Sequence, residues 1–143
     1  MTTKPETKFW KRIKDKFTKV TLTRIEVVTP LGLPDVLAVY KITDKDRGQF
    51  WIELKVTRGN SIGLSPGQIS WHMSHNTNGG KSFIMATPLG RRGISLFSGA
   101  RALSLAKQGL RLDPCAFFPE PCDFSKLEHC LLYTSPSPRD LRA

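Results

Sequence analysis

Two β-strand patterns separated by a charged turn constrain the fold of this chain more than any other feature. Residues 36–42 are a nearly continuous apolar run, and residues 50–57 alternate between apolar and other side chains. The intervening residues 44–48 (Asp-Lys-Asp-Arg-Gly) have the composition of a tight turn. We therefore expect an antiparallel hairpin whose first strand is covered on both faces.

The hairpin predicts which charged side chains meet. Because side chains alternate along a strand, Glu53 and Lys55 project from one face, together with Trp51. The start of one antiparallel strand lies beside the end of the other, so we expect Asp35 near Glu53 although 18 residues separate them. Two carboxylates and an ammonium group in one place suit a divalent metal ion and the hydrolysis of a phosphodiester.

The segments before the hairpin predict one helix and one strand. Apolar residues recur at helical spacing over residues 6–20, with the basic residues largely on the other face. Residues 21–28 are rich in β-branched side chains and are expected to form a strand. Pro30, Gly32 and Pro34 then predict a loop.

A well-formed helix start follows the hairpin. Ser65 is expected as the N-cap, with Pro66 at the first helical position and Gln68 closing a capping box. This helix should end near Asn78. The next strand, residues 82–86, should run parallel to the second strand of the hairpin, because a helical crossover joins them.

The remaining sequence predicts a short edge strand and one more helix. Residues 94–97 suit the strand, and Ser98 is expected to cap a helix that ends near Gly109. Residues beyond Asp113 have no assignable pattern and are expected to be coil. The whole order predicts an α/β fold in which a mixed β-sheet core is flanked by helices.

The length and hydropathy of the chain limit the number of domains and the kind of protein that we expect. A chain of 143 residues has room for one domain with its own core. No apolar run approaches the length of a membrane span, and the first residues do not read as a signal peptide, so we expect a cytoplasmic protein without a membrane partner. The three cysteines, Cys115, Cys122 and Cys130, do not suit a disulfide framework in number or position.

The last residues resemble a sequence that is not native protein. The eleven residues from Cys130 to Asp140 agree with one translated frame of a transposase-type sequencing adapter. We therefore expect a single nuclease-like domain over residues 1–129, with its core in residues 21–109, and a non-native tail over residues 130–143.

Positive charge is in excess along the chain. The formal net charge is +10 at pH 7, and basic residues are frequent in the first 24 residues. An excess of this size favours a polyanionic partner, although a solvated helix face also explains a local run of charge. The candidate phosphate contacts are Lys11, Arg12, Lys14, Arg58, Lys81, Arg91 and Arg92.

The order of these motifs resembles the PD-(D/E)xK nuclease superfamily. The matching segments are Gly32-Leu33-Pro34-Asp35, then Phe50-Trp51-Ile52-Glu53-Leu54-Lys55, then Gln68 with Trp71. The resemblance covers roughly residues 24–86. Within the superfamily, this segment is similar to small domains of the VRR-NUC and phage Holliday-junction-resolvase kind. The Val-Arg-Arg triplet that names one branch is absent. The resemblance implies a restriction-endonuclease-like mixed β-sheet core flanked by helices.

The resemblance also implies a role for each residue of the motifs. Asp35 and Glu53 would bind Mg²⁺ or Mn²⁺, with the backbone carbonyl of Leu54 as a further ligand. Lys55 would position or help deprotonate the attacking water and stabilise the transition state. Gln68 would hydrogen-bond that water or the scissile phosphate.

Several of these side chains also have a purely structural interpretation. A capping box accounts for Gln68 without catalysis, and a strand ion pair accounts for Glu53 with Lys55. Glu26 is either an additional acidic ligand or a solvent-facing strand residue. Trp51 would shield the site, stack on a base or pack in the core.

The histidine and cysteine residues do not favour a zinc site. His72 and His75 have workable spacing on a helix, but no second pair accompanies them at zinc-site spacing. The other candidates, Cys115, Cys122 and His129, do not supply such a pair either.

These patterns together predict a metal-dependent DNA endonuclease, structure-selective and of phage or mobile-element type. Its cofactor would be Mg²⁺ or Mn²⁺ and its macromolecular partner DNA. The resemblance also implies a homodimer, because relatives of this size commonly pair to cut both strands. The alternative is a non-catalytic basic nucleic-acid-binding module on the same fold, which would bind DNA in a salt-sensitive way without a metal-dependent product.

Overall fold

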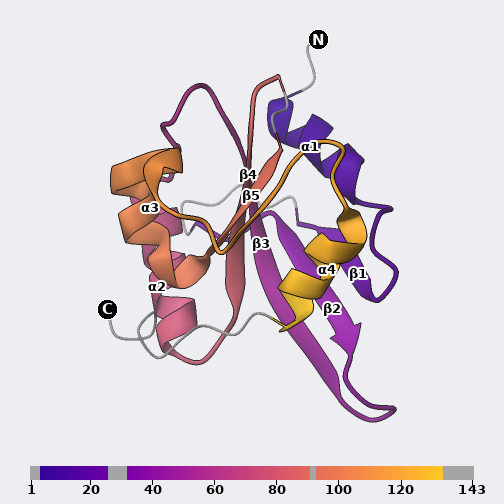
Figure 1. The fold of residues 1–143 in the computed structure, drawn as a ribbon. Coiled ribbons are helices and arrows are strands. Elements are labelled where there is room, and N and C mark those ends of the chain that lie inside the picture. Colours follow the sequence, from indigo (N-terminus) through magenta and orange to yellow (C-terminus); the bar gives the residue numbers. More distant parts are fainter. Residues whose placement is uncertain (1–3, 26–31, 91–92, 134–143) are drawn as a thin grey trace.

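Six strands form one mixed sheet in the computed structural model, which describes residues 4–25, 32–90 and 93–133 (Figure 1). They lie side by side in chain order, and every neighbouring pair is antiparallel except β3 and β4, which are parallel. The strands are β1 (Val20–Arg24), β2 (Val36–Lys41), β3 (Arg47–Thr57), β4 (Ser82–Pro88), β5 (Ile94–Ser98) and β6 (Ala116–Phe118).

Helices cover both faces of this sheet (Figure 1). Phe9 of α1 and Leu131 of α4 belong to the apolar cluster on one face, whereas Leu105 of α3 belongs to the cluster on the other face, against which α2 also packs. The helices are α1 (Pro5–Ile13), α2 (Pro66–Thr77), α3 (Ala102–Gln108) and α4 (Phe124–Tyr133), with the single 3-10 turns η1 (Gly99–Arg101) and η2 (Gly109–Arg111). The predicted α/β class with a mixed sheet flanked by helices is confirmed.

The central hairpin is confirmed, with Val36 of β2 opposite Ile52 of β3. The second strand begins earlier than expected, at Arg47. The expectation that residues 36–42 are covered on both faces is wrong. Val36 is fully buried, but its neighbour Leu37, which points to the other face, is only partly buried.

The crossover after the hairpin is also confirmed. The hydroxyl of Ser65 accepts from Gln68 N at 3.1 Å, and Gln68 Oε1 accepts from Ser65 N at 2.9 Å, which completes the capping box. Helix α2 leads into β4, which pairs in parallel with β3. This order is consistent with a restriction-endonuclease-like core.

The first helix is shorter than the sequence pattern predicts. Helix α1 ends at Ile13 rather than near residue 20. Val20 instead opens β1, where it pairs with Tyr40 of β2. Of the strand expected over residues 21–28, the part after Ile25 lies outside the described residues.

The end of the chain differs most from expectation. Strand β5 does not lie at the edge of the sheet, because Ile94 pairs with Phe118 of β6. The coil expected beyond Asp113 instead contains β6 and the helix α4. No sequence pattern marks β6, since it is only three residues long.

A buried carboxylate attaches α4 to the first strand. Glu128, which is 6% exposed, accepts from Lys19 N at 2.8 Å, from Val20 N at 3.1 Å and from the Thr18 hydroxyl at 3.3 Å. Leu131, within the adapter-like stretch, is 0% exposed and packs in the core, whereas residues 134–143 lie outside the described part of the chain. The domain boundary at residue 129 stays a prediction.

Within the described ranges, every helix is too short or too polar to cross a membrane.

Glu128→Ala is expected to lower the free energy of unfolding by about 2–3 kcal/mol, because the N–H groups of Lys19 and Val20 lose a charged acceptor. Urea unfolding followed by tryptophan fluorescence would measure the loss. The matched control is Lys126→Ala, an exposed position on the same helix, which should change stability by less than about 0.5 kcal/mol. Equal stability of the two variants would contradict the anchoring role of Glu128.

Candidate active site

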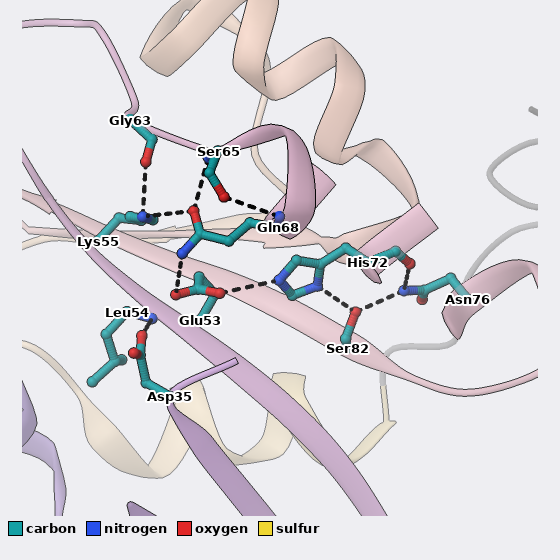
Figure 2. Close-up of polar contacts among 10 residues, drawn as sticks. All are labelled: Asp35, Glu53, Leu54, Lys55, Gly63, Ser65, Gln68, His72, Asn76 and Ser82. Carbon is teal, nitrogen blue, oxygen red and sulfur yellow. Dashed lines mark hydrogen bonds and ion pairs between the residues drawn. The ribbon is translucent and has the colours of Figure 1, made fainter. Parts of the chain in front are cut away.

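The site forms beside the first residue of β2, where β3 continues past its antiparallel partner. The pairing of these strands stops at Val36 and Ile52, and no strand among the described residues pairs with this edge of β3 beyond that point. The side chain of Asp35 takes the place of a strand partner, because its Oδ2 accepts from Leu54 N at 2.8 Å (Figure 2). The strand end thus determines the position of this carboxylate.

A second carboxylate satisfies the next N–H group on the same edge. Glu6, in the first turn of α1, accepts from Val56 N at 3.2 Å through its Oε2. Sequence reasoning missed Glu6 and suggested Glu26 as the additional acid, which lies outside the described residues. The sequence did show Glu6 as an acidic residue in the first turn of a helix. A favourable interaction with the helix dipole explains an acid at that position equally well, so it did not indicate a metal site.

Glu53 and Lys55 point toward the start of α2, as their alternation predicts. Lys55 Nζ donates to Gly63 O at 2.8 Å and to Gln68 Oε1 at 3.1 Å. Gln68 Nε2 donates to Glu53 Oε2 at 3.3 Å. Figure 2 shows these side chains side by side, with Asp35 on the other side of Glu53. The structure therefore brings the four residues that sequence reasoning assigned to one site into one place.

Gln68 serves the capping box and the site at the same time. Its Oε1 accepts from Ser65 N and from Lys55 Nζ, while its amide nitrogen contacts Glu53. The loop before Asp35 contacts this helix start closely. A Cβ atom at Gly32, whose φ is +78°, would clash with the carbonyl group of Gly67. Glycine at position 32 lets the loop and the helix meet.

Burial makes the two central carboxyl groups poor acids. Burial first, and then the negative charge of Glu53, raises the pKa of Asp35 from 3.8 to about 7, against the opposing effects of the Leu54 N–H and of Lys55. Burial also raises the pKa of Glu53, whose side chain is 2% exposed. A nearby positive charge would therefore be favourable at neutral pH.

A buried histidine lies on the far side of Glu53. His72 Nε2 is 3.5 Å from Glu53 Oε1, and burial lowers the pKa of His72 to about 4, so the ring is neutral at pH 7. Sequence reasoning considered His72 only as a zinc ligand and missed this contact. Its spacing of one helical turn from Gln68 was the signal that could have placed it on the same face.

The carboxylates fit a hard divalent cation such as Mg²⁺ or Mn²⁺. Glu53 Oε1 is buried without a hydrogen-bond partner, and Asp35 supplies further oxygen next to it. Within the described residues, no group of three His, Cys, Asp or Glu side chains is close enough to hold a metal ion jointly. Mg²⁺ commonly uses only one or two protein carboxylates and keeps several waters, so Asp35 and Glu53 suffice.

The aromatic and histidine side chains nearby form a packed cluster. The ring of His75 stacks on Trp71 at a centroid distance of 4.5 Å, and His72 meets Trp71 edge-on at 5.3 Å. Trp51, which shares the face of Glu53, also contacts Trp71, at 5.7 Å. Trp51 is partly buried in this cluster beside the site.

Two of the predicted phosphate contacts have protein partners. Lys81 Nζ donates to Leu131 O at 2.7 Å and to Leu132 O at 3.3 Å, on the face of the sheet covered by α4. Arg12 forms an ion pair with Glu120. These side chains hold the C-terminal segment against the core.

Three further predicted phosphate contacts are exposed. Lys11 and Lys14 lie at the end of α1, and Arg58 directly follows β3. Arg91 and Arg92 lie outside the described residues.

Comparison with known proteins finds similarity in structure but not in sequence family. The chain matches no protein-family model and no curated protein. Among solved structures, it is similar to Hjc, a Holliday junction resolvase from Archaeoglobus fulgidus, with 16% sequence identity and a TM-score of 0.45, over 66% of this chain and 74% of that chain. A similarity of this degree carries no functional assignment, so the function must follow from the site residues.

Asp35→Asn is expected to stabilise the protein at pH 8 in EDTA, because it removes a buried charge beside Glu53. Between the ordinary pKa of 3.8 and the folded value of about 7, the folded state holds a proton that the unfolded state has lost. Stability of the wild type should therefore fall, relative to the variant, as pH rises through this range. The gain should be on the order of a few kcal/mol at pH 8 and vanish near pH 4.

Urea unfolding of both proteins across this pH range would measure the difference. Asp113→Asn, at an exposed position, is the matched control and should show no pH-dependent gain. A difference between Asp35→Asn and wild type that does not change with pH would contradict a raised pKa for Asp35.

Proposed function

We propose that this chain is a metal-dependent DNA endonuclease that hydrolyses phosphodiester bonds. The observation that carries the proposal is the meeting of Asp35, Glu53, Lys55 and Gln68 at the open edge of β3. An ordinary strand ion pair does not explain this arrangement, because Lys55 bonds to Gln68 and Gly63 while Glu53 stays buried with one oxygen unpaired.

Asp35 and Glu53 are the proposed protein ligands of Mg²⁺ or Mn²⁺. When bound, such an ion orients water, lowers its pKa and offsets negative charge on a phosphate group. The N–H and C=O groups of one strand residue point to the same neighbour, so the carbonyl of Leu54 also faces the open edge. This orientation supports Leu54 as a further ligand. Glu6 adds a third negative charge near this edge.

Lys55 and Gln68 supply the remaining polar groups. The ammonium group of Lys55 offsets the negative charge that develops on the phosphate and can position the attacking water. Gln68 holds this ammonium group through its Oε1 and holds Glu53 through its amide nitrogen. The capping box fixes the Gln68 side chain at the helix start, so these contacts are set before substrate arrives.

Charge supports a polyanionic substrate. The net charge is +10, and the exposed side chains of Lys11, Lys14 and Arg58 are available for phosphate contacts that position the backbone without reading sequence. The resemblance of the sequence motifs to small phage Holliday-junction-resolvase-like domains supports structure-selective cleavage of the phage or mobile-element kind. It also supports a homodimer, whose two sites would cut both strands of a branched DNA.

Glu53→Gln and Lys55→Ala are each expected to lower the cleavage rate by about 100-fold or more, because the first removes a proposed metal ligand and the second removes the charge that acts on the reacting phosphate. The assay is gel analysis of 5′-labelled linear duplex, single strand, flap and four-way junction DNA with Mg²⁺ or Mn²⁺. EDTA should abolish the product, and the preferred substrate identifies the DNA structure that is cut. Both variants should fold and keep salt-sensitive DNA binding.

The matched control for Lys55→Ala is Lys45→Ala, which removes the same charge from an exposed turn and should cleave like the wild type. Full activity in both site variants would refute the assignment. Salt-sensitive binding without any product from well-folded wild type would favour the non-catalytic binding module.

A further inference from the structure

Three buried polar side chains form a chain of contacts behind Glu53. His72 and Asn76 lie one turn apart on α2, and Ser82 opens β4. Their exposed fractions are 0%, 1% and 1%. Buried polar groups are costly unless they are hydrogen-bonded, so such a cluster needs a reason beyond filling space.

The contacts run in one line toward Glu53 (Figure 2). Asn76 Nδ2 is 2.7 Å from Ser82 Oγ and also donates to His72 O at 2.8 Å. Ser82 Oγ is 2.8 Å from His72 Nδ1. His72 Nε2 then faces Glu53 Oε1 at 3.5 Å, and both of these buried atoms lack any hydrogen-bond partner within the described structure.

Hydrogen-bond geometry indicates which ring nitrogen of His72 carries the proton when the ring is neutral. A hydroxyl group has one proton to donate, and Ser82 Oγ already accepts from the amide of Asn76. If Ser82 donates to His72 Nδ1, the ring proton must be on Nε2, where it faces the carboxylate of Glu53. The other tautomer would place a lone pair of His72 against Glu53 Oε1, which is unfavourable when Glu53 is ionised, the state in which a carboxylate binds a metal ion.

A glycine closes the other side of this cluster. A Cβ atom at Gly99 would clash with Ser82 Oγ and would lie 2.8 Å from both Asn76 Nδ2 and His72 Nδ1. The backbone of η1 therefore covers the polar atoms directly, which leaves little space for water to compete for their hydrogen bonds.

We propose that Asn76 and Ser82 fix His72 with its ring proton on Nε2, so that His72 acts as a positioning residue that orients Glu53 Oε1 toward the metal. Gln68 holds the other oxygen of the same carboxylate. A hydrogen bond from His72 therefore restricts rotation of the Glu53 carboxylate, which the contact with Gln68 alone would leave free. The consequence for metal binding rests on the proposed function, whereas the tautomer of His72 does not.

The first test is the tautomer in the wild-type protein without metal. Long-range ¹H–¹⁵N correlation spectra of the histidine rings distinguish a proton on Nε2 from one on Nδ1. We expect His72 to carry its proton on Nε2 at pH 7, with Nδ1 showing the shift of a hydrogen-bonded acceptor. A proton on Nδ1 would overturn the proposal, whether or not the protein proves to be a nuclease.

The second test compares two replacements of His72. Gln keeps an N–H donor near the position of Nε2, whereas Leu keeps only volume. In calorimetric titrations with Mn²⁺, His72→Leu is expected to lower the affinity by about 10-fold or more, and His72→Gln to retain most of it. The kcat of cleavage should follow the same order, with KM for DNA unchanged.

The outcomes separate the positioning role from packing and from the proposed function. Equal Mn²⁺ affinity in His72→Leu and wild type would overturn the positioning role. Equal losses in His72→Gln and His72→Leu would show that the ring only packs, which also overturns it. If the wild type neither binds Mn²⁺ nor cleaves DNA, the proposed function and the role toward metal both fail, and the ring spectrum still decides the tautomer.

Discussion

The constraint on which the site depends is that β2 begins only at Val36, whereas its antiparallel partner β3 continues past Ile52 to Thr57. It leaves main-chain N–H groups of β3 without a strand partner, and an unpaired buried donor costs about 1–3 kcal/mol. Asp35 and Glu6 accept these hydrogen bonds, at Leu54 and Val56. The same contacts that complete the strand edge therefore gather negative charge beside Glu53.

This gathering of charge is unfavourable unless a cation is near. Burial and mutual repulsion raise the pKa of Asp35 to about 7, and burial raises the pKa of Glu53. Lys55 partly offsets the charge, and its ammonium group is held by the helix start rather than by the carboxylates. The buried carboxylates and Lys55 are thus positioned to bind a divalent cation and a phosphate group. The buried charge lowers the stability of the free protein, and binding of the cation would offset this loss.

Local patterns made the central part of the molecule predictable from sequence. The hairpin periodicity and the capping box at Ser65 each specify one structure, so the meeting of Asp35 and Glu53 followed from geometry. The contacts of Glu6 and His72 were missed, because helical spacing shows that His72 shares a face with Gln68 but does not show how α1 and α2 pack on the sheet. Strand β6 and helix α4 were missed for the same reason, since long-range contacts such as those of Glu128 stabilise them.

The most direct measurement is anomalous diffraction from crystals grown with Mn²⁺. We expect one strong peak between Asp35 and Glu53, about 2.0–2.4 Å from a carboxylate oxygen of each and near the carbonyl of Leu54. The peak should be lost in crystals of Glu53→Gln. A wild-type crystal with no peak at this place, or with Mn²⁺ bound only elsewhere, would contradict the central claim that the open edge of β3 is a metal site.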